Sequence, residues 1–195
     1  MIKFQFDGKV FDRKTNFENL SEHQQNLVFK EKFYTLAHSN NIVIRHLRDG
    51  EHIDLYYEYG RPSADAIFIV DGGISLSETF VKEDRVQYEL AFHELLHILS
   101  VPPNLRHLMS HDTEYSYSLI RKEYSDIQRL STESAVLGLQ SLLYEKMNVT
   151  GWLRGSFFTG YLRSIGDDKM PFTDVKDEWR IRGKKLLKLI NTEFI

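Results

Sequence analysis

The segment His93-Glu94-Leu95-Leu96-His97 combines two imidazoles and a carboxylate at a spacing that suits a metal centre. On an α-helix, side chains four residues apart lie on the same face with Cβ atoms about 5–6 Å apart, so both rings can approach one ion. Zinc binds imidazole nitrogens at about 2.0–2.1 Å. Glu94 is angularly offset from the histidines, where it can accept a proton from water that the metal activates. The motif therefore predicts a zinc site with His93 and His97 as ligands and Glu94 as general base.

This motif needs a rigid helix, and the flanking sequence predicts one from about residue 84 to residue 99. No Gly or Pro interrupts that segment, and Pro102-Pro103 ends it. Its apolar residues occupy nearly every angle around the axis: Val86, Leu90, Ala91, Phe92, Leu95, Leu96, Ile98 and Leu99. Such a helix belongs in a core, where histidines need polar partners and a metal supplies them. The competing interpretation is two core histidines with hydrogen-bond partners and a surface glutamate.

The composition limits the other functions of the chain. Its 195 residues, 42% of them hydrophobic, suffice for a single domain, with the sheet and motif helix in residues 1–100 and a helical part in residues 101–195. The absence of cysteine leaves His, Asp and Glu as the strong metal ligands and favours a reducing compartment. The net charge of −3 and the pI of about 6.2 argue against a nucleic-acid partner. No apolar run reaches signal-peptide or transmembrane length, so we expect a cytoplasmic protein without a membrane partner.

Turn signals and periodicity predict the remaining elements. Residues 2–6 and 9–11 flank Asp7-Gly8 as a hairpin, and a capping box of Ser21 and Gln24 begins a helix that extends to residue 38. Further strands are expected at residues 42–44, 52–59 and 66–70, and further helices at residues 114–127, 132–147, 152–165 and 174–191. A small N-terminal mixed sheet followed by a mainly helical C-terminal half predicts an α+β fold.

A strand at residues 66–70 followed by a helix with H-E-x-x-H resembles the zincin fold of zinc metallopeptidases. The resemblance covers roughly residues 42–147, and the five-residue motif is its specific part. It implies a zinc-dependent peptidase that hydrolyses a protein or peptide substrate. It also implies that the strand at residues 66–70 is an edge strand, to which the substrate backbone adds as a further strand.

A catalytic zinc needs a third protein ligand beside its water, and the resemblance to gluzincins implies a glutamate on a later helix. Glu133 fits that description, because it opens the apolar helix predicted at residues 132–147. The small residues Ala135 and Gly138 would let this helix approach the motif helix closely. The alternative role for Glu133 is stabilisation of its own helix N-terminus.

A metzincin-like ligand set is the alternative. Ser100 and Pro103 stand where that family has glycine and histidine, so the pattern fails as written. A variant that uses His107 or His111 remains open, because both residues follow the Pro102-Pro103 break. Two aspartates, Asp112 and Asp126, are a third choice with little support.

Two other functions compete with the peptidase. The first is a regulatory or structural protein that keeps a zincin scaffold and its metal with little or no proteolysis. The second is nucleic-acid processing with the basic residues between Trp179 and Lys188 as the docking surface, which the acidic net charge disfavours. The alternative explanation for these basic residues is that they form a solvent-exposed face near a helix C-terminus, where the helix dipole favours lysine.

Overall fold

The computed structural model describes residues 4–6, 9–11, 17–47, 67–77, 80, 85–110, 116, 120, 133–147 and 177–193. Three predicted elements lie wholly or mostly outside these residues: the strand at residues 52–59, the helix at residues 152–165 and most of the helix at residues 114–127. His111, Asp112 and Asp126 also lie outside them.

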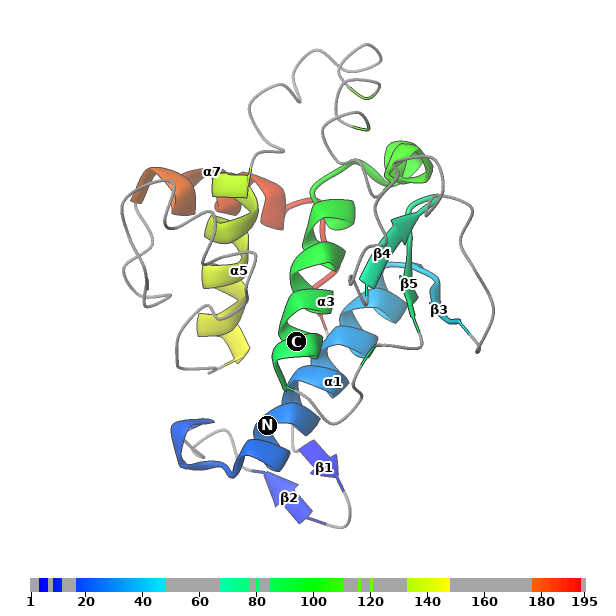
Figure 1. The fold of residues 1–195 in the computed structure, drawn as a ribbon. Helices are drawn as coiled ribbons and strands as arrows, with labels where there is room; N and C mark the ends of the chain where they lie inside the picture. Colours follow the sequence, from blue (N-terminus) through cyan, green and yellow to red (C-terminus); the bar gives the residue numbers. More distant parts are fainter. Residues whose placement is uncertain are drawn as a thin grey trace, which may run out of the picture.

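The described residues form a mixed α+β structure, as the sequence predicts (Figure 1). The strands β1 (Phe4–Phe6) and β2 (Lys9–Phe11) pair as the predicted antiparallel hairpin. Helix α1 (Glu22–Ser39) follows, and its predicted capping box is confirmed. The Ser21 amide donates to Gln24 Oε1 at 2.9 Å, and the Gln24 amide donates to Ser21 Oγ at 3.3 Å. These two bonds satisfy amides that a helix start would otherwise leave without partners.

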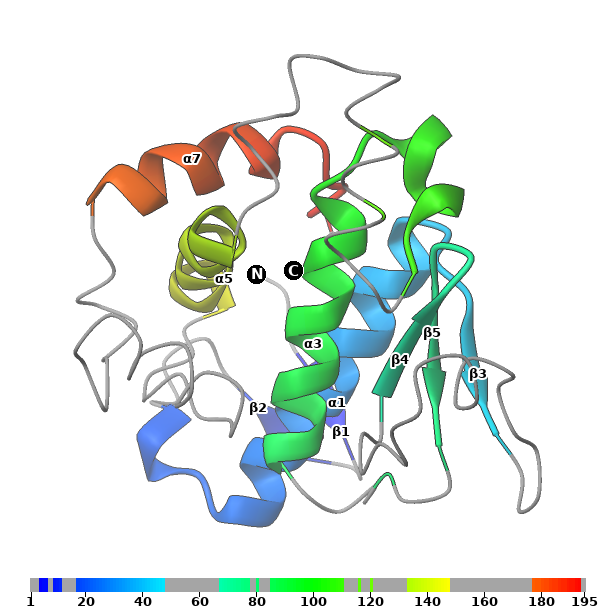
Figure 2. The ribbon, with the colours of Figure 1, turned by 45° about the horizontal axis from the view of Figure 1, so that its top comes forward.

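The sheet contains three strands in the order β3 (Ile44–His46), β5 (Gly73–Leu76) and β4 (Ile67–Val70). Strand β3 runs parallel to β5, and β4 runs antiparallel to it. The predicted edge strand is therefore confirmed as β4 at one edge of the described sheet. Figure 2 shows β4 as the strand nearest the motif helix.

Strand β5 is absent from the sequence-based prediction, which ends a strand at residue 70 and has none directly after it. Asp71 (φ 49°) and Gly72 (φ 71°) instead turn the chain directly back into β5. Two successive residues with positive φ are typical of a tight hairpin turn. A side chain at Gly72 would also overlap the carbonyl of Arg106, and the Gly72 amide donates to the Met109 carbonyl at 2.9 Å.

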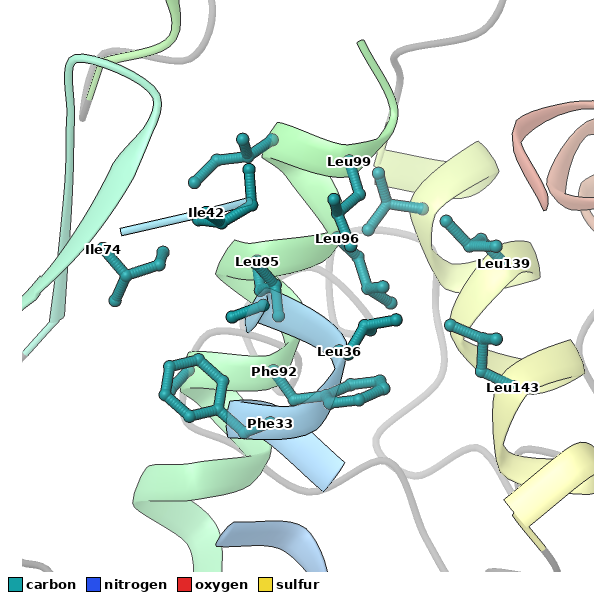
Figure 3. Packing of buried hydrophobic residues seen from close by; sticks show 14 of the residues in the cluster. Phe33, Leu36, Ile42, Ile74, Phe92, Leu95, Leu96, Leu99, Leu139 and Leu143 are labelled. Carbon is teal, nitrogen blue, oxygen red and sulfur yellow. The ribbon is translucent and has the colours of Figure 1, made fainter. Parts of the chain in front are cut away.

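The motif helix α3 (Arg85–Leu99) lies at the centre of the molecule, with α1 and the sheet on one side and α5 (Glu133–Met147) on the other. The apolar side chains of α3 that the structure describes are buried on both sides of the helix, with Leu90 partly buried. Figure 3 shows Leu95 and Phe92 near Phe33 and Leu36 of α1, while Leu96 and Leu99 lie toward Leu139 of α5. One continuous hydrophobic cluster joins α1, the sheet, α3, α5 and α7 (Asp177–Leu187).

Helices α5 and α7 cross at a pair of glycines. A Cβ at Gly138 would overlap the carbonyl of Trp179, and a Cβ at Gly183 would overlap the backbone of Gly138 and Leu139. The expectation that Gly138 brings its helix close to the motif helix is therefore wrong, because Gly138 contacts α7. The glycine pair holds α7 across α5, and α5 in turn packs against α3.

No described helix combines the length and the apolar character that crossing a membrane requires.

Candidate metal centre

Helix α3 places the three motif side chains in different surroundings. His93 and His97 are buried, with 0% and 2% of their surface exposed, and Glu94 is half-buried. This difference follows from the helix geometry, because residues 93 and 97 share a face while residue 94 is rotated by about 100° from residue 93. Helix geometry thus accounts for a buried histidine pair beside an offset carboxylate.

The two histidine rings point at each other through their Nε2 atoms. These nitrogens are 3.0 Å apart, and the rings are nearly perpendicular, with centroids 4.7 Å apart. Two nitrogens bound to one tetrahedral zinc at the usual bond length lie about 3.3–3.4 Å apart, so a metal would need to separate this pair by only a few tenths of an ångström. Borderline-soft imidazole nitrogen is a donor that zinc prefers, so the pair fits two of the ligands of a zinc site.

The opposite nitrogen of His93 is held by α5. His93 Nδ1 lies 3.1 Å from Oε1 of the buried Gln140. An amide oxygen only accepts hydrogen bonds, so Nδ1 must carry the proton. In the neutral ring Nε2 is then unprotonated, which is the form that binds a metal.

Two further hydrogen bonds extend this contact through the interior. Gln140 Nε2 donates to the Tyr144 hydroxyl at 2.8 Å, and that hydroxyl donates to Glu89 Oε1 at 2.9 Å. Gln140, Tyr144 and Glu89 are all buried, with at most 1% of their surface exposed. The bonds agree with one another in direction, since each group donates to the next from His93 to the Glu89 carboxylate. We refer to Glu89, His93, Gln140 and Tyr144 together as the Gln140 network.

The sequence motif by itself assigns no role to Glu89, Gln140 or Tyr144. Their spacing carries a signal, because Glu89 precedes His93 by four residues and Tyr144 follows Gln140 by four residues. Each pair therefore shares a helix face. A polar face on an otherwise apolar buried helix indicates a polar partner on the facing helix. The sequence does not reveal that α3 and α5 are those facing helices.

The described residues around His93 and His97 do not include a third metal ligand. Among the residues that the structure describes, no three His, Asp or Glu side chains lie together as a metal site requires. His107 is exposed on the 3-10 helix η2 (Pro103–Leu108), where it lines a separate cavity of about 290 Å³. Glu133 is the first residue of α5, but its side chain lies outside the described residues. Its role as third ligand stays a prediction.

The register of α3 against α5 gives the level of Glu133. Glu89 pairs with Tyr144 and His93 pairs with Gln140, so the two helices run antiparallel. One turn farther along both helices, the same register places Val136 level with His97. Glu133 lies three residues before Val136, so it is about 4.5 Å beyond the level of His97 along the axis of α5. A ligand at position 133 must therefore extend back toward His97 from the start of α5.

The chain matches no protein-family model, no curated protein and no solved structure.

Proposed function

We propose that this protein is a zinc-dependent peptidase with a zincin-like fold. The observation that carries the proposal is the pair of Nε2 atoms of His93 and His97, which face each other on a buried helix while Gln140 holds the Nδ1 proton of His93. The 3.0 Å separation is also that of a hydrogen bond between the two rings, which a bound metal would replace. The position of β4 at one edge of the described sheet, beside α3, supports the same family of folds, because a substrate strand can pair at such an edge.

Each motif residue has a defined role in this proposal. His93 and His97 hold the metal through Nε2, and Glu133 from α5 completes the set of protein ligands. A zinc ion held there would supply Lewis-acid chemistry, lowering the pKa of a bound water toward about 7. Glu94 accepts the proton of the attacking water and donates it to the amine that leaves as the C–N bond breaks. The proton is thus returned, and Glu94 is regenerated.

The activity test starts with the metal content of the purified protein and continues with hydrolysis of unfolded casein. We expect cleavage by the zinc-loaded protein, loss of cleavage after chelation and recovery after zinc is added back. Unfolded casein offers many sequences in extended form, so it suits an enzyme of undefined preference. Zinc-loaded protein that leaves casein and a diverse peptide library intact would favour the regulatory or structural alternative.

A further inference from the structure

The Gln140 network closes a ring between two helices. Its four members form two pairs at four-residue spacing, Glu89 and His93 on α3 and Gln140 and Tyr144 on α5. Three hydrogen bonds of 2.8–3.1 Å connect them: two cross from α3 to α5, and the third joins Gln140 to Tyr144 along α5. A buried hydrogen bond whose partner is removed leaves a desolvated polar group, so each member depends on the others.

The ring fixes two properties of His93. The Gln140 oxygen selects the tautomer that has its proton on Nδ1, and it also limits rotation of the imidazole about its side-chain bonds. Gln140 is oriented in turn, because its amide nitrogen must face the Tyr144 hydroxyl and its oxygen must then face His93. The Tyr144 ring is itself held by Phe29 and Phe92, with centroids 5.5 and 6.1 Å away.

We propose that Gln140 is a positioning residue for the metal, and that Tyr144 and Glu89 hold it in the orientation that this role requires. The proposal rests on the proposed zinc site. Partners of the second nitrogen of a ligating histidine orient the ring and raise its basicity, and their loss costs about 10–100-fold in metal affinity. Here the ultimate acceptor is the carboxylate of Glu89, which is two side chains away from the histidine. The network therefore sets how tightly this site holds its metal.

The test compares zinc affinity, measured by competition with a chromophoric chelator, across matched variants. Gln140→Met keeps the approximate size of the side chain but has no acceptor, so we expect affinity to fall about 10–100-fold. Gln140→Glu keeps an oxygen for the Nδ1 proton and should restore affinity to within about threefold of the parent. Ser141→Ala is the control, because Ser141 is the buried neighbour of Gln140 on α5 and accepts from Arg180 at 3.0 Å. Equal affinities of the Gln140→Met and Ser141→Ala proteins would overturn the proposal.

A second measurement reads the tautomer without any metal. In the parent protein labelled with ¹⁵N-histidine, we expect the protonated nitrogen of His93 to be Nδ1, and Gln140→Met should remove that preference. A parent protein with the proton on Nε2 would overturn the proposal.

Should Gln140→Met fail to fold, Tyr144→Phe keeps the aromatic ring, and its zinc affinity should still fall. An unchanged affinity would again contradict us. A parent with the expected tautomer that binds no zinc would instead overturn the proposed function and leave the hydrogen-bond ring intact.

Discussion

Glu94 differs from the two histidines in exposure, as the proposed roles of general base and metal ligands require. The histidines are buried and face each other, whereas Glu94 is half-buried on a neighbouring face of α3. Glu94→Gln removes a proton acceptor but keeps the size of the side chain. We expect this variant to keep its zinc and its melting temperature while kcat for casein or peptide cleavage falls at least about 100-fold. A variant that cleaves as fast as the parent would refute Glu94 as the base.

The identity of the third ligand is the part of the proposed site that the described residues define least. We expect Glu133→Ala to weaken zinc binding by at least about 10–100-fold, because a carboxylate on a packed helix is held more rigidly than a histidine beyond a Pro-Pro break. His107→Ala and His111→Ala should keep affinity near the parental value. Titration of all three variants against the same chelator decides the matter. The opposite ranking would favour the metzincin-like ligand set.

At this scale the sequence predicts the histidine pair and the offset carboxylate but not the partners of His93. H-E-x-x-H is contained in one turn of helix, so helix geometry alone defines its faces. Gln140 is 47 residues away from His93 and reaches it only through the packing of α5 on α3. A contact of that separation depends on the tertiary register, which single-sequence periodicity does not encode.

At the scale of the elements, the crossing of α5 and α7 determines how α5 is presented to α3. Both Gly138 and Gly183 lie where a Cβ would overlap the backbone of the other helix. Alanine normally stabilises a helix relative to glycine by about 0.5–1 kcal/mol. Here the overlap should reverse that sign, so we expect Gly138→Ala and Gly183→Ala each to lower the free energy of unfolding by about 1–3 kcal/mol.

Urea unfolding monitored by tryptophan fluorescence measures this effect, since Trp179 lies at the crossing. Lys184→Ala is the matched control, because Lys184 is on the exposed side of α7. A Gly138→Ala protein that is more stable than the parent would show that the helices do not approach this closely.

The elements also show which local signals were sufficient. The capping box, the pairing of the strands at residues 4–6 and 9–11 and the helix before Pro102-Pro103 are each encoded by nearby residues, and all three are confirmed. Strand β5 was missed because Gly73 is a poor strand former, and only its pairing with both β3 and β4 makes it a strand. The role of Gly138 was assigned to the wrong neighbour because a small residue indicates close packing without identifying the partner.

At the scale of the whole molecule, the buried Arg106 connects segments that are distant in sequence. Its guanidinium donates to the Asn40 carbonyl at the end of α1 and to the Leu189 carbonyl after α7, at 3.2 and 3.1 Å. Its Nε donates to the Val101 carbonyl at 3.1 Å. All three acceptors are backbone carbonyls just beyond the ends of helices. Arg106 therefore supplies donors to carbonyls that the helices themselves leave without partners.

Buried Lys32 predicts how the stability of the whole molecule changes with pH. Burial lowers the pKa of Lys32 from 10.5 to about 8, and Glu31 opposes that shift only in part. At pH 7 the ammonium is protonated in both the folded and the unfolded states, so folding carries the full cost of burying the charge. Between about pH 8 and 10.5 the folded state has released the proton that the unfolded state still holds. The contribution of Lys32 to stability therefore rises with pH across that window.

We expect Lys32→Met to be more stable than the parent at pH 7, with an advantage that shrinks as the pH approaches 10. Urea unfolding at pH 7, 8, 9 and 10 gives the comparison, and Lys184→Met is the exposed control. An advantage that stays constant with pH would show that Lys32 titrates at its ordinary pKa.

The zinc content of the purified protein tests the central claim most directly. After saturation with zinc and removal of excess metal, elemental analysis should find about one zinc per chain in the parent. The double variant His93→Ala, His97→Ala should retain almost none, and its melting temperature should no longer rise with added zinc. The control is His38→Ala, His46→Ala, which changes two exposed histidines and should keep one zinc. Stoichiometric zinc in the His93→Ala, His97→Ala protein, or none in the parent, would contradict a metal centre on α3.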